Sequence, residues 1–114
     1  MSHGQTLELW QTEWCPASHR VRQRLTELGL TYVSRQVPVD PAARTELEAA
    51  TAQRTIPALV IPSGPILRDE AAILDYLDTH YDEPPGAVTQ RQKAAKAKRK
   101  ELEAACPQLT AATQ

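Results

Sequence analysis

The stretch Trp14-Cys15-Pro16-Ala17-Ser18 joins two patterns that decide the fold. Within residues 6–11, Leu7 and Leu9 alternate with Glu8 and Trp10, which is typical of a strand, and apolar residues recur at helical spacing over 16–28. Cys15 therefore falls at the N-cap of the predicted helix, and Pro16 takes the first helical position, where its missing N–H costs nothing. Unpaired amides and the helix dipole there favour a thiolate, with a pKa below the free-cysteine value of about 8.5. Cys15 is a candidate nucleophile; the alternative is a cysteine that only caps the helix.

The length and composition indicate one domain with a modest core. The 114 residues include no phenylalanine, so Val, Leu and Ile must fill the core, with Trp10, Tyr32 and Tyr76 as aromatic additions. Residues 1–86 carry seven Lys/Arg and twelve Asp/Glu (7 − 12 = −5), and residues 87–114 carry six and two (6 − 2 = +4). This split predicts a basic tail that docks on its own domain or on an acidic partner. The charge is too small to indicate a nucleic-acid partner.

The sequence favours a cytoplasmic protein without a membrane segment. No stretch approaches the roughly 20 apolar residues of a membrane span, and Glu8 interrupts the apolar segment that a signal peptide would need. Cys15 and Cys106 lie 91 positions apart and do not form a disulfide framework. Because no His/Cys group has metal-ligand spacing, we expect no metal site built by the protein.

The predicted element order is β-α-β-α-β-β-α, followed by a linker and one more helix. A right-handed crossover makes the first two strands parallel, and a turn at Ser63-Gly64 forms a hairpin from the last two. Glu83-Pro84-Pro85-Gly86 reads as a linker, and Thr89 with Gln92 resembles a capping box for the last helix. The predicted strands are 6–11, 32–37, 58–61 and 66–67, and the helices are 16–28, 41–50, 70–81 and about 90–105. The chain thus divides into a domain over 1–83 and a linker with a basic helix and tail over 84–114.

Three segments in this order together resemble the thioredoxin superfamily, most closely glutaredoxins and the N-terminal domains of glutathione S-transferases. They are the helix-capping cysteine, Thr55-Ile56-Pro57 before a buried strand, and Arg68-Asp69-Glu70 before a helix. Residues 15–20, Cys-Pro-Ala-Ser-His-Arg, are similar to the glutaredoxin segment Cys-Pro-x-Cys-His-Arg, with Ser18 replacing the second cysteine. The resemblance covers about residues 6–81. It implies a thioredoxin-like α/β fold with a four-stranded mixed sheet, here with one extra C-terminal helix.

The resemblance also implies a site for a small thiol. A cis Ile56–Pro57 bond would let the backbone of Ile56 pair with an extended thiol peptide, and a trans proline at a strand start is the alternative. Asp69 and Glu70 lie where these domains hold the γ-glutamyl end of glutathione, although helix capping alone would explain Asp69. Glu70 departs from the serine of most transferase domains, and its carboxylate would repel that of the substrate.

Further residues complete this predicted site. Trp14 either shields one side of the sulfur or has a plain packing role, and Arg20 or Arg54 supplies the positive charge of a lysine that glutaredoxins carry where Thr12 stands. The predicted small-thiol site comprises Trp14, Pro16, Arg54, Ile56, Pro57, Asp69 and Glu70, with Cys15 and Ser18 as catalytic residues.

The implied function is that of a single-cysteine, glutaredoxin-like thiol–disulfide oxidoreductase, with no cofactor beyond a small thiol such as glutathione. Ser18 cannot resolve a mixed disulfide but can donate a hydrogen bond to the Cys15 thiolate, and Cys106 is either a distant resolving thiol or incidental. Protein disulfides would be the partners. The alternatives are a glutathione-dependent iron–sulfur cluster protein and a non-catalytic interaction module.

The 28 residues after the linker are too few for the helical second domain of a transferase, so we expect no transfer to bulky electrophiles. The oligomeric state stays open.

Overall fold

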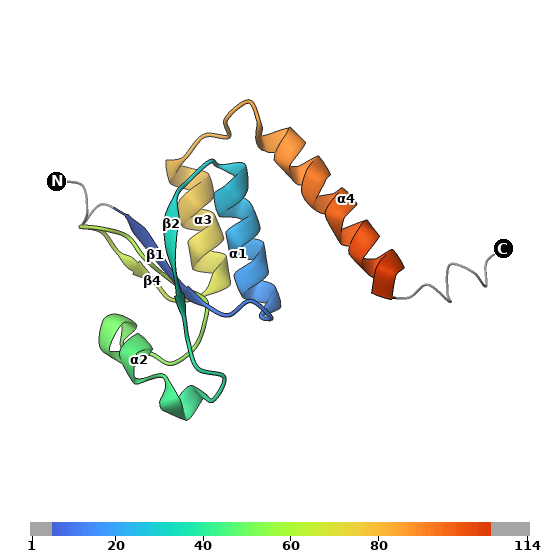
Figure 1. Ribbon diagram of the computed structural model, residues 1–114. Helices are drawn as coiled ribbons and strands as arrows, with labels where there is room; N and C mark the ends of the chain where they lie inside the picture. Colours follow the sequence, from blue (N-terminus) through green and yellow to red (C-terminus); the bar gives the residue numbers. More distant parts are fainter. Residues whose placement is uncertain (1–5, 106–114) are drawn as a thin grey trace.

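The computed structural model describes residues 6–105 and confirms the predicted element order (Figure 1). The strands are β1 (Leu7–Gln11), β2 (Tyr32–Gln36), β3 (Ala58–Val60) and β4 (Ile66–Leu67). The helices are α1 (Pro16–Glu27), α2 (Thr45–Thr51), α3 (Glu70–His80) and α4 (Ala87–Ala105), and a short 3-10 helix (Pro41–Ala43) precedes α2. None of the helices in this part of the chain is long and apolar enough to span a membrane.

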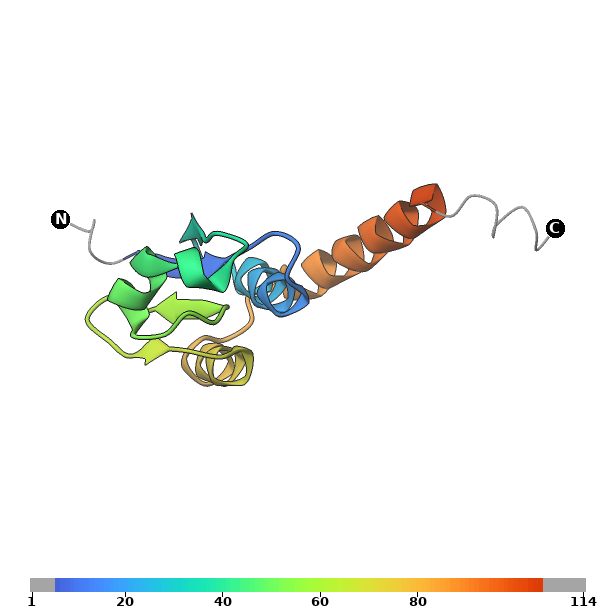
Figure 2. The ribbon, with the colours of Figure 1, turned by 90° about the horizontal axis from the view of Figure 1, so that it is seen from below.

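The four strands form one mixed sheet in the order β2-β1-β3-β4. β1 runs parallel to β2 and antiparallel to β3, and β3 pairs antiparallel with β4. Helices α1 and α3 lie side by side over one face of the sheet, and α2 covers the other face (Figures 1 and 2). This arrangement is the thioredoxin-like α/β fold that the sequence predicts.

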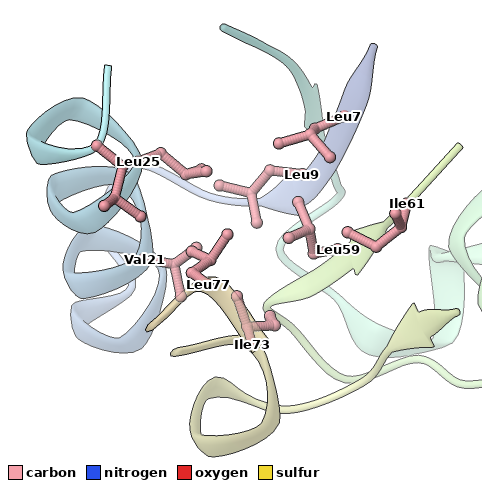
Figure 3. Packing of buried hydrophobic residues seen from close by; sticks show 9 residues of the cluster. Leu7, Leu9, Val21, Leu25, Leu59, Ile61, Ile73 and Leu77 are labelled. Carbon is pink, nitrogen blue, oxygen red and sulfur yellow. The ribbon is translucent and has the colours of Figure 1, made fainter. Parts of the chain in front are cut away.

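The main core lies between the sheet and the pair α1 and α3 (Figure 3). Alternation along β1 directs Leu7 and Leu9 into this core and Trp10 to the opposite face, where a smaller cluster lies under α2. Tyr32 and Tyr76 pack against the main cluster, so the three aromatic residues contribute to the core as predicted. The fully buried members of the main cluster are Leu9, Val21, Leu25, Leu59, Ile73 and Leu77.

The helix predicted over 41–50 is interrupted at Arg44, which corrects one prediction. Asp40 caps only the 3-10 helix, and α2 begins afresh at Thr45. Arg44 has a non-helical ψ of 54°, and its buried guanidinium donates hydrogen bonds to the carbonyls of Pro38, Val39 and Arg54. Seating the Arg44 side chain among these carbonyls turns the backbone out of the helix.

The last helix begins at Ala87 rather than near residue 90, so Thr89 and Gln92 lie inside α4 and the predicted capping box is wrong. The amide of Ala87 donates to the carbonyl of Pro84, and the side chain of Ala87 is buried. Burial of Ala87 and the hydrogen-bonded turn that precedes it explain why the helix begins earlier than the polar residues Thr89 and Gln92 indicate.

A network of ion pairs joins the start of α4 to the rest of the domain. Arg91 contacts Glu27 at 3.1 Å and Glu83 at 2.7 Å, and Arg24 contacts Glu83 at 2.6 Å and Asp78 at 2.8 Å. Beyond these contacts α4 diverges from α1 toward its C-terminal end (Figures 1 and 2). The helix is therefore attached to the domain mainly at its first turns.

This network predicts that α4 loses its attachment in acid. Hydrogen bonds from Arg91 and Arg24 lower the pKa of Glu83 to about 2. A carboxyl whose pKa is lower in the folded chain adds stability above its unfolded pKa and loses it as the pH falls through the folded value. We therefore expect the urea midpoint to drop between pH 4.5 and pH 2. Glu83→Gln is expected to lower the midpoint at pH 7 and to show a smaller acid-induced drop; equal drops in both proteins would contradict this role.

Candidate functional site

Cys15 caps α1 as predicted. Its backbone is extended (φ −78°, ψ 120°), its Sγ accepts a hydrogen bond from the amide of Ser18 at 3.4 Å, and Pro16 follows in the first turn. The thiol is free and partly exposed. Cys15 therefore presents its sulfur at the amino-terminal end of a twelve-residue helix, where anions are stabilised.

The surroundings of Cys15 lower its pKa below the ordinary cysteine value. Burial raises the pKa, but the hydroxyl and amide of Ser18, the amide of Ala17 and the charge of Arg20 together outweigh it. The Ser18 side chain is fully buried. Its hydroxyl oxygen makes no hydrogen bond of good geometry to a described residue, but the hydroxyl still helps to lower the pKa of Cys15. The direction of the shift is the one that the sequence predicts.

Arg20, in the second turn of α1, connects this helix to the start of α3 at this end of the molecule. Its guanidinium binds both carboxylate oxygens of Glu70, with Nη2 at 2.9 Å from Oε1. Arg20 also supplies a positive charge that favours the Cys15 thiolate. Of the two arginines expected to supply a positive charge near Cys15, Arg20 is the one whose charge lowers the pKa of this thiol. Arg54 instead binds Glu48 at 2.8 Å and the carbonyl of Ala42, beside α2.

Replacing Arg20 with glutamine is expected to raise the pKa of Cys15, because the cation that favours the thiolate is lost. A titration of thiolate ultraviolet absorbance measures the shift. Arg54→Gln is the matched control, since Arg54 is held by Glu48 and does not act on Cys15. The interpretation fails if both variants keep the pKa of the unchanged protein, or if both shift it equally.

The start of α3 contributes the second part of the site. Asp69 caps the helix by accepting a hydrogen bond from the amide of Ala72 at 2.8 Å. The amides of Glu70 and Ala71 precede the first intrahelical bond, so they have no partner within the helix. The capping role of Asp69 is thus observed, and the free first-turn amides can donate hydrogen bonds to a ligand carboxylate.

The Ile56–Pro57 peptide bond is cis. Residue Trp10 of β1 pairs with Ala58 of β3, so Pro57 lies beside the end of β1 from which the chain continues to Cys15. Pro57 is buried and Ile56 partly exposed, and no hydrogen bond to the backbone of Ile56 forms among residues 6–105. The fold therefore gathers Cys15, Pro57 and the start of α3 at one end of the molecule.

An open groove of about 910 Å³ lies between α1 and the diverging part of α4, and we call it the α1–α4 groove. Cys15 and Pro16 line it together with Trp14, which is 62% exposed and therefore lies outside the core. The full lining is Glu13, Trp14, Cys15, Pro16, His19, Arg20, Arg22, Gln23, Arg91, Ala94, Ala95, Ala97, Lys98 and Glu101. Ser18, Arg54, Ile56, Pro57, Asp69 and Glu70 lie outside this lining.

The contribution of α4 is the part of the site that the sequence did not reveal. The α4 residues of the lining lie on one face of the helix, because most of them are three or four positions apart. They include Arg91, Ala94, Ala95, Lys98 and Glu101. That periodicity is visible in the sequence, but it does not say which neighbour the face meets. Cys106 lies outside the described residues, and within them no three His, Cys, Asp or Glu side chains are grouped to hold a metal ion.

Comparisons with known proteins agree with the fold. The family described as "Glutathione S-transferase, N-terminal domain" matches residues 14–80. A glutathione S-transferase domain-containing protein from Marinobacter aquaeolei VT8 is 32% identical, with a TM-score of 0.57 over 68% of this chain and 40% of that one. A glutathione transferase family member from Pseudomonas fluorescens Pf-5, with bound glutathione, is 29% identical, with a TM-score of 0.62 over 70% of this chain and 40% of that one.

A diazinon-metabolizing glutathione S-transferase from Bombyx mori is 27% identical, with a TM-score of 0.58 over 67% of this chain and 38% of that one. The chain thus spans about two fifths of the length of these solved structures. No curated protein sequence matches.

Proposed function

The chain belongs to the family of glutathione S-transferase N-terminal domains, and from this premise we propose that it exchanges glutathione with protein mixed disulfides through Cys15. The observation that carries the proposal is the helix-capping thiol, whose pKa is lowered by Ser18, Ala17 and Arg20 against the effect of burial. Family membership supports glutathione as the small thiol, because the relative from Pseudomonas fluorescens holds it.

The proposed reaction proceeds in two thiol–disulfide exchange steps. The Cys15 thiolate attacks the glutathione sulfur of a protein mixed disulfide; the bond between Cys15 and glutathione forms, and the protein thiolate leaves and takes a proton from water. A second glutathione, as thiolate, attacks the glutathione sulfur bound to Cys15, which releases glutathione disulfide and restores the Cys15 thiolate. Glutathione supplies both electrons. A lowered pKa raises the reactive fraction of Cys15 and makes it a better leaving group.

The surrounding residues have separate roles in this proposal. The free backbone of Ile56 pairs with the glutathione backbone, and the first turn of α3, with Asp69, holds its γ-glutamyl end. Glu70 was expected to repel the substrate carboxylate. Its pairing with Arg20 offsets that charge, so the substrate meets an ion pair rather than a free anion. Trp14 and Pro16 border the sulfur on the groove side. Arg54 does not contact glutathione in this proposal, because it is held beside α2 by Glu48 and the carbonyl of Ala42.

Intact-mass analysis after incubation with glutathione disulfide tests the proposal. We expect one glutathione adduct in the unchanged protein and in Cys106→Ser, and its reversal by added glutathione. An adduct that persists in Cys15→Ser and disappears in Cys106→Ser would show that Cys106 reacts instead of Cys15, and would contradict the proposal. The absence of any adduct on Cys15 would remove the proposed cycle altogether.

A further inference from the structure

We propose that the α1–α4 groove docks an acidic segment of the protein that carries the mixed disulfide. This inference rests on the proposed function and deepens it, because it names the class of protein substrate. Glutathione is assigned to the end formed by Pro57 and the start of α3, whereas the groove lies on the other side of Cys15, against α4. The two surfaces share Cys15 and its neighbours Trp14, Pro16 and Arg20.

The groove has the position and size for such a segment. Cys15 contributes to its lining, so a chain lying in the groove brings a neighbouring disulfide to the sulfur. Its volume of about 910 Å³ is near the upper end of the range typical of small-molecule sites. Ala94, Ala95 and Ala97 line the α4 side, where their small side chains leave room for a bound chain. Trp14, 62% exposed, offers an apolar surface beside Cys15.

The charge of α4 selects an acidic partner. The helix carries six Lys/Arg and two Asp/Glu (6 − 2 = +4), whereas residues 1–86 carry a net charge of −5. Arg91 is engaged by Glu27 and Glu83, but the remaining cations form no ion pair with a residue of the described part of the chain. These are Lys93, Lys96, Lys98, Arg99 and Lys100. Lys98 lines the groove itself, and the other four increase the positive potential along the helix that steers an acidic segment toward it.

The test compares Lys98→Glu with Lys96→Glu. Both variants reverse one charge on α4, but only Lys98 lines the groove. The substrates are a glutathionylated peptide with flanking aspartates and glutamates, a matched peptide with flanking lysines, and the small mixed disulfide of glutathione and mercaptoethanol. We expect the unchanged protein to prefer the acidic peptide. Lys98→Glu is expected to lower kcat/KM for that peptide about fivefold, with little change for the small disulfide, and Lys96→Glu to have a clearly smaller effect.

Docking is also measured without the chemistry, by tryptophan fluorescence with an acidic peptide that carries serine in place of the glutathionylated cysteine. Saturable binding that weakens in high salt and in Lys98→Glu is the expected result. A protein that docks this peptide but turns over no disulfide would refute the proposed function and leave the groove assignment intact. Three results would overturn the assignment: equal kcat/KM for both peptides, equal effects of the two substitutions, or dissociation of a dimer by Lys98→Glu, which would make a second copy of the chain the occupant.

Discussion

Cys15→Ser is expected to reduce turnover of a glutathionylated protein substrate to the rate of glutathione alone. The serine hydroxyl is not ionised at neutral pH and does not attack disulfides, so neither exchange step can proceed through residue 15. Ser18, one helical turn away, offers only another hydroxyl. The release of the substrate thiol, followed with a chromogenic reagent in the presence of glutathione, measures the loss.

Cys106→Ser is the matched control for this experiment. It removes the other cysteine of the chain by the same chemical change and is expected to keep the full rate. If Cys15→Ser also keeps the rate of the unchanged protein, the chain acts through another group or is an interaction module without this activity. A loss in Cys106→Ser as large as that in Cys15→Ser would instead indicate the two-cysteine cycle considered for Cys106.

Leu25→Ala is expected to lower the free energy of unfolding by about 3 kcal/mol. Leu25 is fully buried on α1, where it packs against the sheet and α3 in the main cluster (Figure 3). Truncation removes apolar contact and leaves a cavity, which costs about 2–5 kcal/mol at such sites. Urea denaturation with extrapolation to water gives the difference.

The exposed leucine Leu102 supplies the control for this prediction. Leu102 is 58% exposed on α4, so Leu102→Ala makes the same chemical change without opening a cavity. We expect a change within about 0.5 kcal/mol. Similar losses in both variants would mean that Leu25 does not pack in the core as described.

Local signals account for what the sequence predicted well. The cap at Cys15 depends on residues within one turn, and Gly29, with φ of +70°, ends α1 as its position after the apolar pattern indicates. The cis Ile56–Pro57 bond was expected only through the family resemblance, because Ile-Pro alone favours trans. Element order and core composition followed from such signals.

Contacts between distant residues account for what the sequence did not reveal. The Arg20–Glu70 pair joins residues 50 positions apart and requires α1 and α3 to be packed first. Arg44 looked like an ordinary helical residue, and its break follows from carbonyls that only the folded loop brings together. The groove depends on the angle at which α4 leaves its ion-paired first turns, which no local pattern encodes.

The rate at which iodoacetamide alkylates Cys15, followed against pH in the Cys106→Ser protein, measures the pKa of the Cys15 thiol. The amides of Ala17 and Ser18, the hydroxyl of Ser18 and the charge of Arg20 lower the pKa of Cys15 although partial burial raises it. We therefore expect an inflection below the free-cysteine value of about 8.5. An inflection at or above that value would contradict it.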